Sequence, residues 1–65
     1  MHSVGDIVRL SPRVPDNDLV GFLAIIEKVY VPHFMDYAYH IRFLDINNFT
    51  EHRTGDVKAS WVNKI

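Results

Sequence analysis

The sequence contains no cysteine, so neither a disulfide framework nor a thiolate metal site can stabilise it, and nothing in it indicates an oxidising compartment. It also lacks a long apolar run. The longest one, residues 19–26, is interrupted by Gly21 and is too short to cross a bilayer. The first residues show neither the charged nor the apolar region of a signal peptide. These absences predict a soluble, cytoplasmic protein that does not contact a membrane.

The chain is also short, and neither acidic nor basic residues dominate it. Sixty-five residues form a single domain, residues 1–65, and a chain of this size buries only about 60% of the surface that its unfolded state exposes. A deep catalytic cleft is therefore not expected. Eight acidic and seven basic residues give a formal net charge of -1, which differs from the strongly basic balance of a typical nucleic-acid-binding protein.

The apolar residues that are present follow the alternation of β-strands. Val8 and Leu10 share one face of an early segment, and Tyr39, Ile41 and Phe43 share one face of a central segment. Turn-forming residues separate such segments. The sequence therefore predicts an all-β fold with a short 3₁₀ turn before the last strand and with strands near residues 5–10, 21–31, 37–45, 54–58 and 63–65.

The segment 21–31 has two interpretations. It is rich in β-branched residues and ends at Pro32, which is typical of a strand. Asp18 is also a suitable helix cap, and Phe22 and Ile26 are at helical spacing. We favour the strand because β-branched residues are restricted in helices and because the flanking strands need partners.

The order of these features resembles that of the SH3-like small β-barrels. The opening GDIVRL, the glycine before FLAIIEKV, the central YHIRF and the closing ASWVNKI follow the order found across that group, over nearly the whole chain. The resemblance implies a five-stranded barrel. Residues 47–52, NNFTEH, are also similar to the end of the photosystem I subunit PsaE, a barrel of this type, although this chain continues for thirteen more residues. The group includes KOW and Tudor-like modules and accessory subunits, so the fold alone implies no single function.

No catalytic or metal-binding constellation is recognisable in the sequence. The histidines have neither helical i, i+4 spacing nor a companion cysteine, so ordinary surface histidines are favoured over metal ligands, and the first one is expected in a frayed terminus. No nucleophile stands with a base, and there is no glycine-rich phosphate loop. We therefore expect a non-enzymatic protein without metal or cofactor. The four histidines are His2, His33, His40 and His52.

All three tyrosines lie in YVPHFMDYAY, residues 30–39, around a proline at which a hairpin turn is expected. A hairpin tip cannot bury its side chains in the core that the strands enclose, and protein interfaces are enriched in aromatic residues and methionine. In the alternative, which stays open, Phe34 folds back on a neighbouring tyrosine and has no partner. The predicted protein-binding residues are Pro32, His33, Phe34, Met35 and Tyr37.

The predicted function is that of a small accessory or regulatory protein, of phage or bacterial type, that docks on a larger protein through this loop. Self-association through the same loop is an open alternative. The second hypothesis is a nucleic-acid-binding barrel, because small barrels bind nucleic acid through basic residues and stacking aromatics. Trp61 is expected to pack in the core at the base of the barrel. The basic candidates on the outer face are Arg9, Lys28, Arg42, Arg53 and Lys58.

Overall fold

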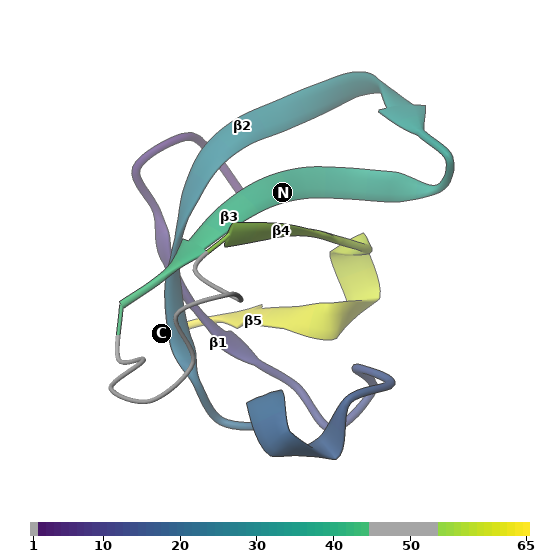
Figure 1. Cartoon of the computed structure of the whole chain (residues 1–65). Coiled ribbons are helices and arrows are strands. Elements are labelled where there is room, and N and C mark those ends of the chain that lie inside the picture. The colour runs from purple at the N-terminus through teal and green to yellow at the C-terminus, as the bar shows by residue number, and fades with distance from the viewer. Residues whose placement is uncertain (1, 45–53) are drawn as a thin grey trace.

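The computed structural model describes residues 2–44 and 54–65, with His33 and Phe34 described by their backbone alone (Figure 1). Five strands form one antiparallel sheet in the order β4-β3-β2-β1-β5. The described residues contain no α-helix, so the all-β prediction is confirmed. In chain order the elements are β1 (Ile7–Leu10), η1 (Asn17–Leu19), β2 (Leu23–Phe34), β3 (Tyr37–Phe43), β4 (Thr54–Val57), η3 (Ala59–Trp61) and β5 (Val62–Lys64).

One face of the sheet forms the core. The strand register places Val8 opposite Ala24 and Ile26 opposite Ile41. Because side chains alternate along a strand, these four residues point to the same side of the sheet, and all four are buried. The alternation read from the sequence therefore identified the core face. The remaining core residues are Leu10, Val14, Ala38, Tyr39, Phe43, Val57 and Val62.

The second segment is a strand, and the helical alternative is wrong. β2 pairs with β1 on one side and with β3 on the other. It therefore supplies the hydrogen-bonding partner that each of these two strands needs. Pro32 does not end this strand, contrary to the sequence prediction, because β2 continues to Phe34. The proline is tolerated where the ladder with β3 is irregular, between Val29 and Phe34, since it has no N–H to donate to a regular ladder.

The loop between β1 and β2 is tied to η3. Ser11 donates its backbone N–H to the carbonyl of Trp61 over 2.7 Å and its hydroxyl to the carbonyl of Ser60 over 3.2 Å. Within the loop, Asp16 accepts a hydrogen bond from the N–H of Asp18 and caps η1. Gly21 closes the loop with φ +88°, a value that L side chains rarely adopt. This loop and η3, the 3₁₀ turn that the sequence predicted before the last strand, therefore cover one end of the core.

The sheet curls around its core without closing (Figure 1). β4 and β5 are its two edges, and no pairing joins them in residues 2–44 and 54–65. The five-stranded antiparallel sheet is thus established, whereas closure into a barrel is not. The same two ranges contain no helix that is long and apolar enough to cross a membrane.

Candidate functional site

The β2–β3 hairpin projects beyond the rest of the sheet (Figure 1). β2 is 12 residues long, whereas β1 has 4 residues and its register with β2 ends at Ile25. The outer half of β2 therefore extends past its inner neighbour. Val31 is 86% exposed and Met35 is 74% exposed, and Pro32 is exposed between them. The hairpin thus presents apolar side chains to solvent at the place where the sequence predicted a binding loop.

The hairpin tip has unusual backbone conformations. Phe34 pairs with Tyr37, so Met35 and Asp36 form a two-residue turn, with φ of 52° and 71°. Two positive φ values are typical of a type I′ turn, in which asparagine and glycine are preferred. A methionine in this region costs about 1 kcal/mol or more. For stability alone, asparagine or glycine would be favoured over methionine at position 35.

A wide irregularity precedes the turn. Val29 pairs with Tyr39 and Phe34 with Tyr37, so residues 30–33 of β2 lie opposite the single residue Ala38 of β3. The peptide bond between Val31 and Pro32, inside this irregularity, is cis. Extra residues of this kind bend a strand and redirect its side chains, and they are frequent near functional sites.

The predicted binding residues do not all lie at the tip. Pro32 and Met35 are exposed, but Tyr37 is half-buried and packs edge to face against Trp61, with ring centroids 6.1 Å apart. Tyr37 therefore anchors the hairpin to η3. The side chains of His33 and Phe34 lie outside the described part of the chain, so the alternative in which Phe34 folds back stays open. Trp61 packs against the core, as predicted, although it is only partly buried.

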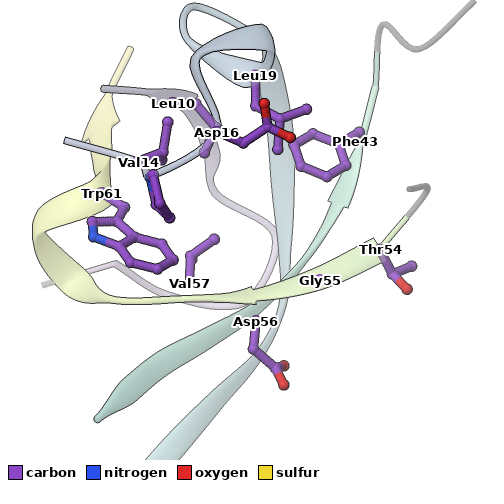
Figure 2. Close-up of a pocket in the computed structure, with 11 residues that line it drawn as sticks. Leu10, Val14, Asp16, Leu19, Phe43, Thr54, Gly55, Asp56, Val57 and Trp61 are labelled. Atoms are coloured by element: carbon purple, nitrogen blue, oxygen red, sulfur yellow. The ribbon is translucent and has the colours of Figure 1, made fainter. Parts of the chain in front are cut away.

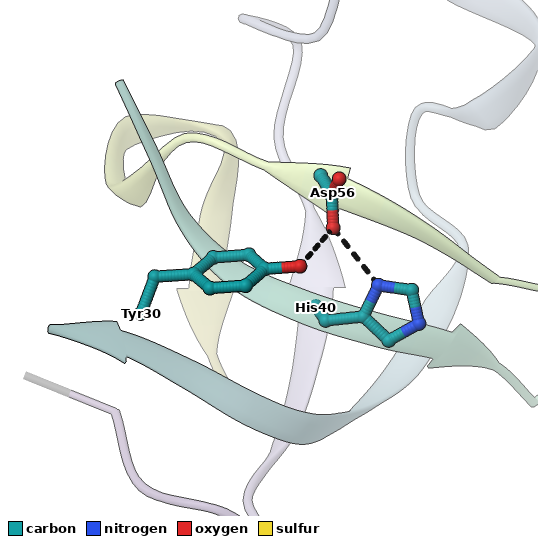
Figure 3. A network of polar contacts seen from close by, with 3 residues as sticks. All are labelled: Tyr30, His40 and Asp56. Carbon is teal, nitrogen blue, oxygen red and sulfur yellow. Dashed lines mark hydrogen bonds and ion pairs between the residues drawn. The ribbon is translucent and has the colours of Figure 1, made fainter. Parts of the chain in front are cut away.

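A polar network joins the hairpin to β4 on the outer face of the sheet (Figure 3). The hydroxyl of Tyr30 donates to Oδ1 of Asp56 over 2.7 Å, and Nδ1 of His40 lies 2.9 Å from the same oxygen. The three residues come from β2, β3 and β4 in that order. This network was not predictable from the sequence, because its members are 16 and 26 residues apart in the chain and only the strand register brings them together.

The network shifts the ionisation of two of its members. The Tyr30 hydroxyl and then His40 hold the pKa of Asp56 below its ordinary value, with a further contribution from the charge of Lys28. The hydrogen bond to Asp56 raises the pKa of Tyr30. The lowered pKa of Asp56 and the raised pKa of Tyr30 extend the pH range in which the aspartate is ionised, the tyrosine is neutral and the hydrogen bond forms. The Asp56 and His40 side chains are each 33% exposed, so this arrangement is a structural brace open to solvent rather than an enclosed acid–base site.

The basic candidates are mixed with acidic groups. Arg9, Lys28 and Arg42 lie on the same outer face by strand register, but Nε of Arg42 forms an ion pair with Glu27 over 3.1 Å. Nζ of Lys28 lies 5.3 Å from the ring centroid of Tyr30. Nζ of Lys58 lies over the ring of Trp61, 5.7 Å from its centroid. Arg53 is outside the described residues. The described face therefore carries charges of both signs.

Two of the histidines can be placed. His2 is not frayed, contrary to the sequence prediction: its backbone N–H donates to the hydroxyl of Tyr39 over 3.2 Å, and its ring packs edge to face on the same tyrosine. His40 belongs to the network on the outer face, so the two rings do not converge on one site. His33 and His52 lie outside the described side chains. Among those that are described, no group of three or more metal-binding side chains is placed to hold a metal ion.

A cavity of about 150 Å³ opens between β4, the loop after β1 and η3 (Figure 2). The cavity was not predicted from the sequence, since its described walls come from five separate parts of the chain. The one available signal was Gly55, because a glycine inside a strand leaves space where a side chain would stand. The lining residues are Leu10, Val14, Pro15, Asp16, Leu19, Phe43, Thr54, Gly55, Asp56, Val57 and Trp61.

Comparison of the chain with protein-family models, with curated protein sequences and with solved structures gave no match.

Proposed function

We propose that this protein is a non-enzymatic binding module, a small accessory or regulatory subunit that docks on a larger protein through the tip of its β2–β3 hairpin. The observation that carries the proposal is the exposure of Val31 and Met35 on a segment that projects from the sheet. Buried apolar anchors supply most of the affinity of a protein interface, and methionine is enriched there.

The base of the hairpin supports this role. Tyr30 is held by Asp56 on the outer face, and Tyr37 packs on Trp61 at the other side of the hairpin. Contacts of this kind fix the direction of the tip before a partner arrives, so less conformational entropy is lost on binding. The strained φ of Met35 supports the same proposal, since strained residues concentrate at functional positions.

We also propose that the curled sheet belongs to the SH3-like barrels. Three features support this: the strand order, the position of β5 beside β1, and η3 directly before β5. We assign the protein to the small accessory proteins of that architecture, and its partner is to be identified from the hairpin tip rather than from the fold.

The charge distribution favours a protein partner over a nucleic acid. The ion pair between Arg42 and Glu27 and the acidic Asp56 beside Lys28 interrupt the basic residues of the outer face. Phosphate contacts release counterions, so nucleic-acid binding weakens steeply as salt rises. Binding to DNA or RNA that persists at physiological salt would contradict the proposal.

Photo-crosslinking from the tip tests the proposal directly. A photoreactive analogue of methionine at position 35, which keeps an apolar side chain there, should crosslink to one protein in an extract of the native source, and excess unlabelled protein should compete. A competitor carrying Val31→Ser and Met35→Ser should compete at least several-fold less well. The matched control is a competitor with Val4→Ser and Ile65→Ser, since these residues are also apolar and each 64% exposed but lie outside the hairpin. Equal competition by both double variants would contradict docking through the tip.

A further inference from the structure

The cavity beside β4 has the size and lining of a small apolar binding site. An engineered protein cavity of about 150 Å³ lined by aliphatic and aromatic side chains stays dry and binds benzene. The present cavity has about 150 Å³, and most of its walls are apolar. The described lining residues do not enclose it completely. In Figure 2 Trp61 and Val57 border one side, and Leu19 and Phe43 border the other.

The charge at the cavity is negative on one side. Asp16 lines it on the side of Leu19 and Phe43, across from Trp61 (Figure 2). No basic residue is among the lining residues that the structure describes. Asp56 contributes its backbone, because its side chain points away to the outer face and bonds Tyr30. A positively charged group beside Asp16 would therefore be favoured, and an anionic group would be disfavoured.

We propose that this cavity binds an arylalkylammonium ligand: an aromatic ring of benzene size between Trp61 and Phe43, with its ammonium group at Asp16. The site is separate from the hairpin tip, and the proposal does not depend on docking through the tip. Two different observations on the described lining residues carry it: the volume and apolar lining select the ring, and the carboxylate of Asp16 selects the charge. Aromatic rings that meet edge to face add to the burial of the ligand ring.

Gly55 offers a way to close the cavity without disturbing the fold. It pairs with the buried Ile41, so a side chain at position 55 would point to the inner face of the sheet, where the cavity lies. A Cβ placed there meets no atom within 4 Å, and φ of Gly55 is not in the left-handed range. Gly55→Leu should therefore fold and fill the cavity.

Three probes of similar shape test the proposal: benzylammonium, neutral toluene and anionic phenylacetate. Trp61 is the one tryptophan of the sequence and lines the cavity, so its fluorescence reports on occupancy, and amide chemical shifts locate the probe. We expect millimolar or tighter binding of benzylammonium, with shifts at Val14, Gly55 and Trp61 and not at Met35. Toluene should bind several-fold more weakly, and phenylacetate most weakly.

Two variants and a matched control separate the roles of shape and charge. Gly55→Leu should abolish binding of all three probes. Asp16→Asn keeps an acceptor that caps η1, and it should remove the advantage of benzylammonium over toluene. Asp18→Asn also removes one negative charge, but Asp18 is not among the described lining residues. This variant should therefore keep most of the preference for benzylammonium over toluene. The proposal is overturned if the probes leave the three cavity amides unmoved, if they move Met35 instead, or if Gly55→Leu binds as well as the wild type.

Discussion

The two halves of the β2–β3 hairpin have similar residues and opposite environments. In the inner half, Ile26 and Ile41 face each other and are 1% and 0% exposed. In the outer half of the same hairpin, Val31 is 86% exposed. The difference arises because β1 and β4 flank only the inner half. Apolar side chains thus form the core in one half, whereas in the other half they are exposed to solvent.

The two halves also differ in regularity. In the inner half the ladder is broken once, between Ile26 and Lys28, whereas the outer half has a wide irregularity and a turn with two positive φ values. Selection for stability alone favours regular ladders and asparagine or glycine in such a turn. The irregular outer half is in keeping with the proposed docking role, and the following variants test the difference between the two halves.

The largest effect on stability is expected at Ile41. Ile41→Ala leaves a cavity among fully buried neighbours and should lower the free energy of unfolding by about 2–5 kcal/mol. For a domain of this size that loss approaches the total stability. Urea denaturation followed by circular dichroism measures it. A loss below 1 kcal/mol would show that the inner half does not form the main core.

A smaller effect is expected at the network between the two halves. Asp56→Ala removes both hydrogen bonds to Oδ1 and should cost about 1 kcal/mol near neutral pH, because the carboxylate is partly exposed and screened.

The pH dependence of this loss has a defined sign. The pKa of Asp56 is lowered from 3.8 in the folded protein, so its contribution is present above pH 3.8 and is lost as the pH falls through the folded value. The pKa of Tyr30 is raised from 10.0, so its contribution is present below pH 10.0 and is lost at higher pH. The difference in stability between wild type and Asp56→Ala should therefore narrow at both ends of the pH range. The difference between wild type and Tyr30→Phe should also narrow at both ends, because the hydrogen bond that Tyr30 donates needs the ionised carboxylate of Asp56 and the neutral hydroxyl of Tyr30. A difference that does not change with pH would rule out the network as drawn.

A gain in stability is expected at the turn. Met35→Asn places a residue that tolerates the left-handed region at the first turn position, and it should raise the free energy of unfolding by about 0.5–1 kcal/mol. The same variant should dock less well, because it removes an exposed apolar side chain. Thermal denaturation and the competition assay measure the two effects. A variant that is both more stable and equally competent in docking would show that Met35 has no binding role.

The smallest effect on stability is expected at Val31. Val31→Ser should change the free energy of unfolding by less than about 0.5 kcal/mol, the range of ordinary surface substitutions. Its effect on competition for the crosslink should still be several-fold. If Val31→Ser unfolds the protein as Ile41→Ala does, the outer half belongs to the folding core and the contrast between the halves is lost.

The sequence by itself determined the fold class, the inner face of the central strands and the apolar character of the hairpin tip. The fold class and the inner face follow from the alternation of apolar residues with a period of two. The apolar character of the tip follows directly from its residues. Tertiary structure alone decided the length of β2 beyond Pro32, the network of Tyr30, His40 and Asp56, and the cavity opposite Gly55. These features depend on register, and a shift of one residue between strands changes which side chains meet although the local pattern stays the same.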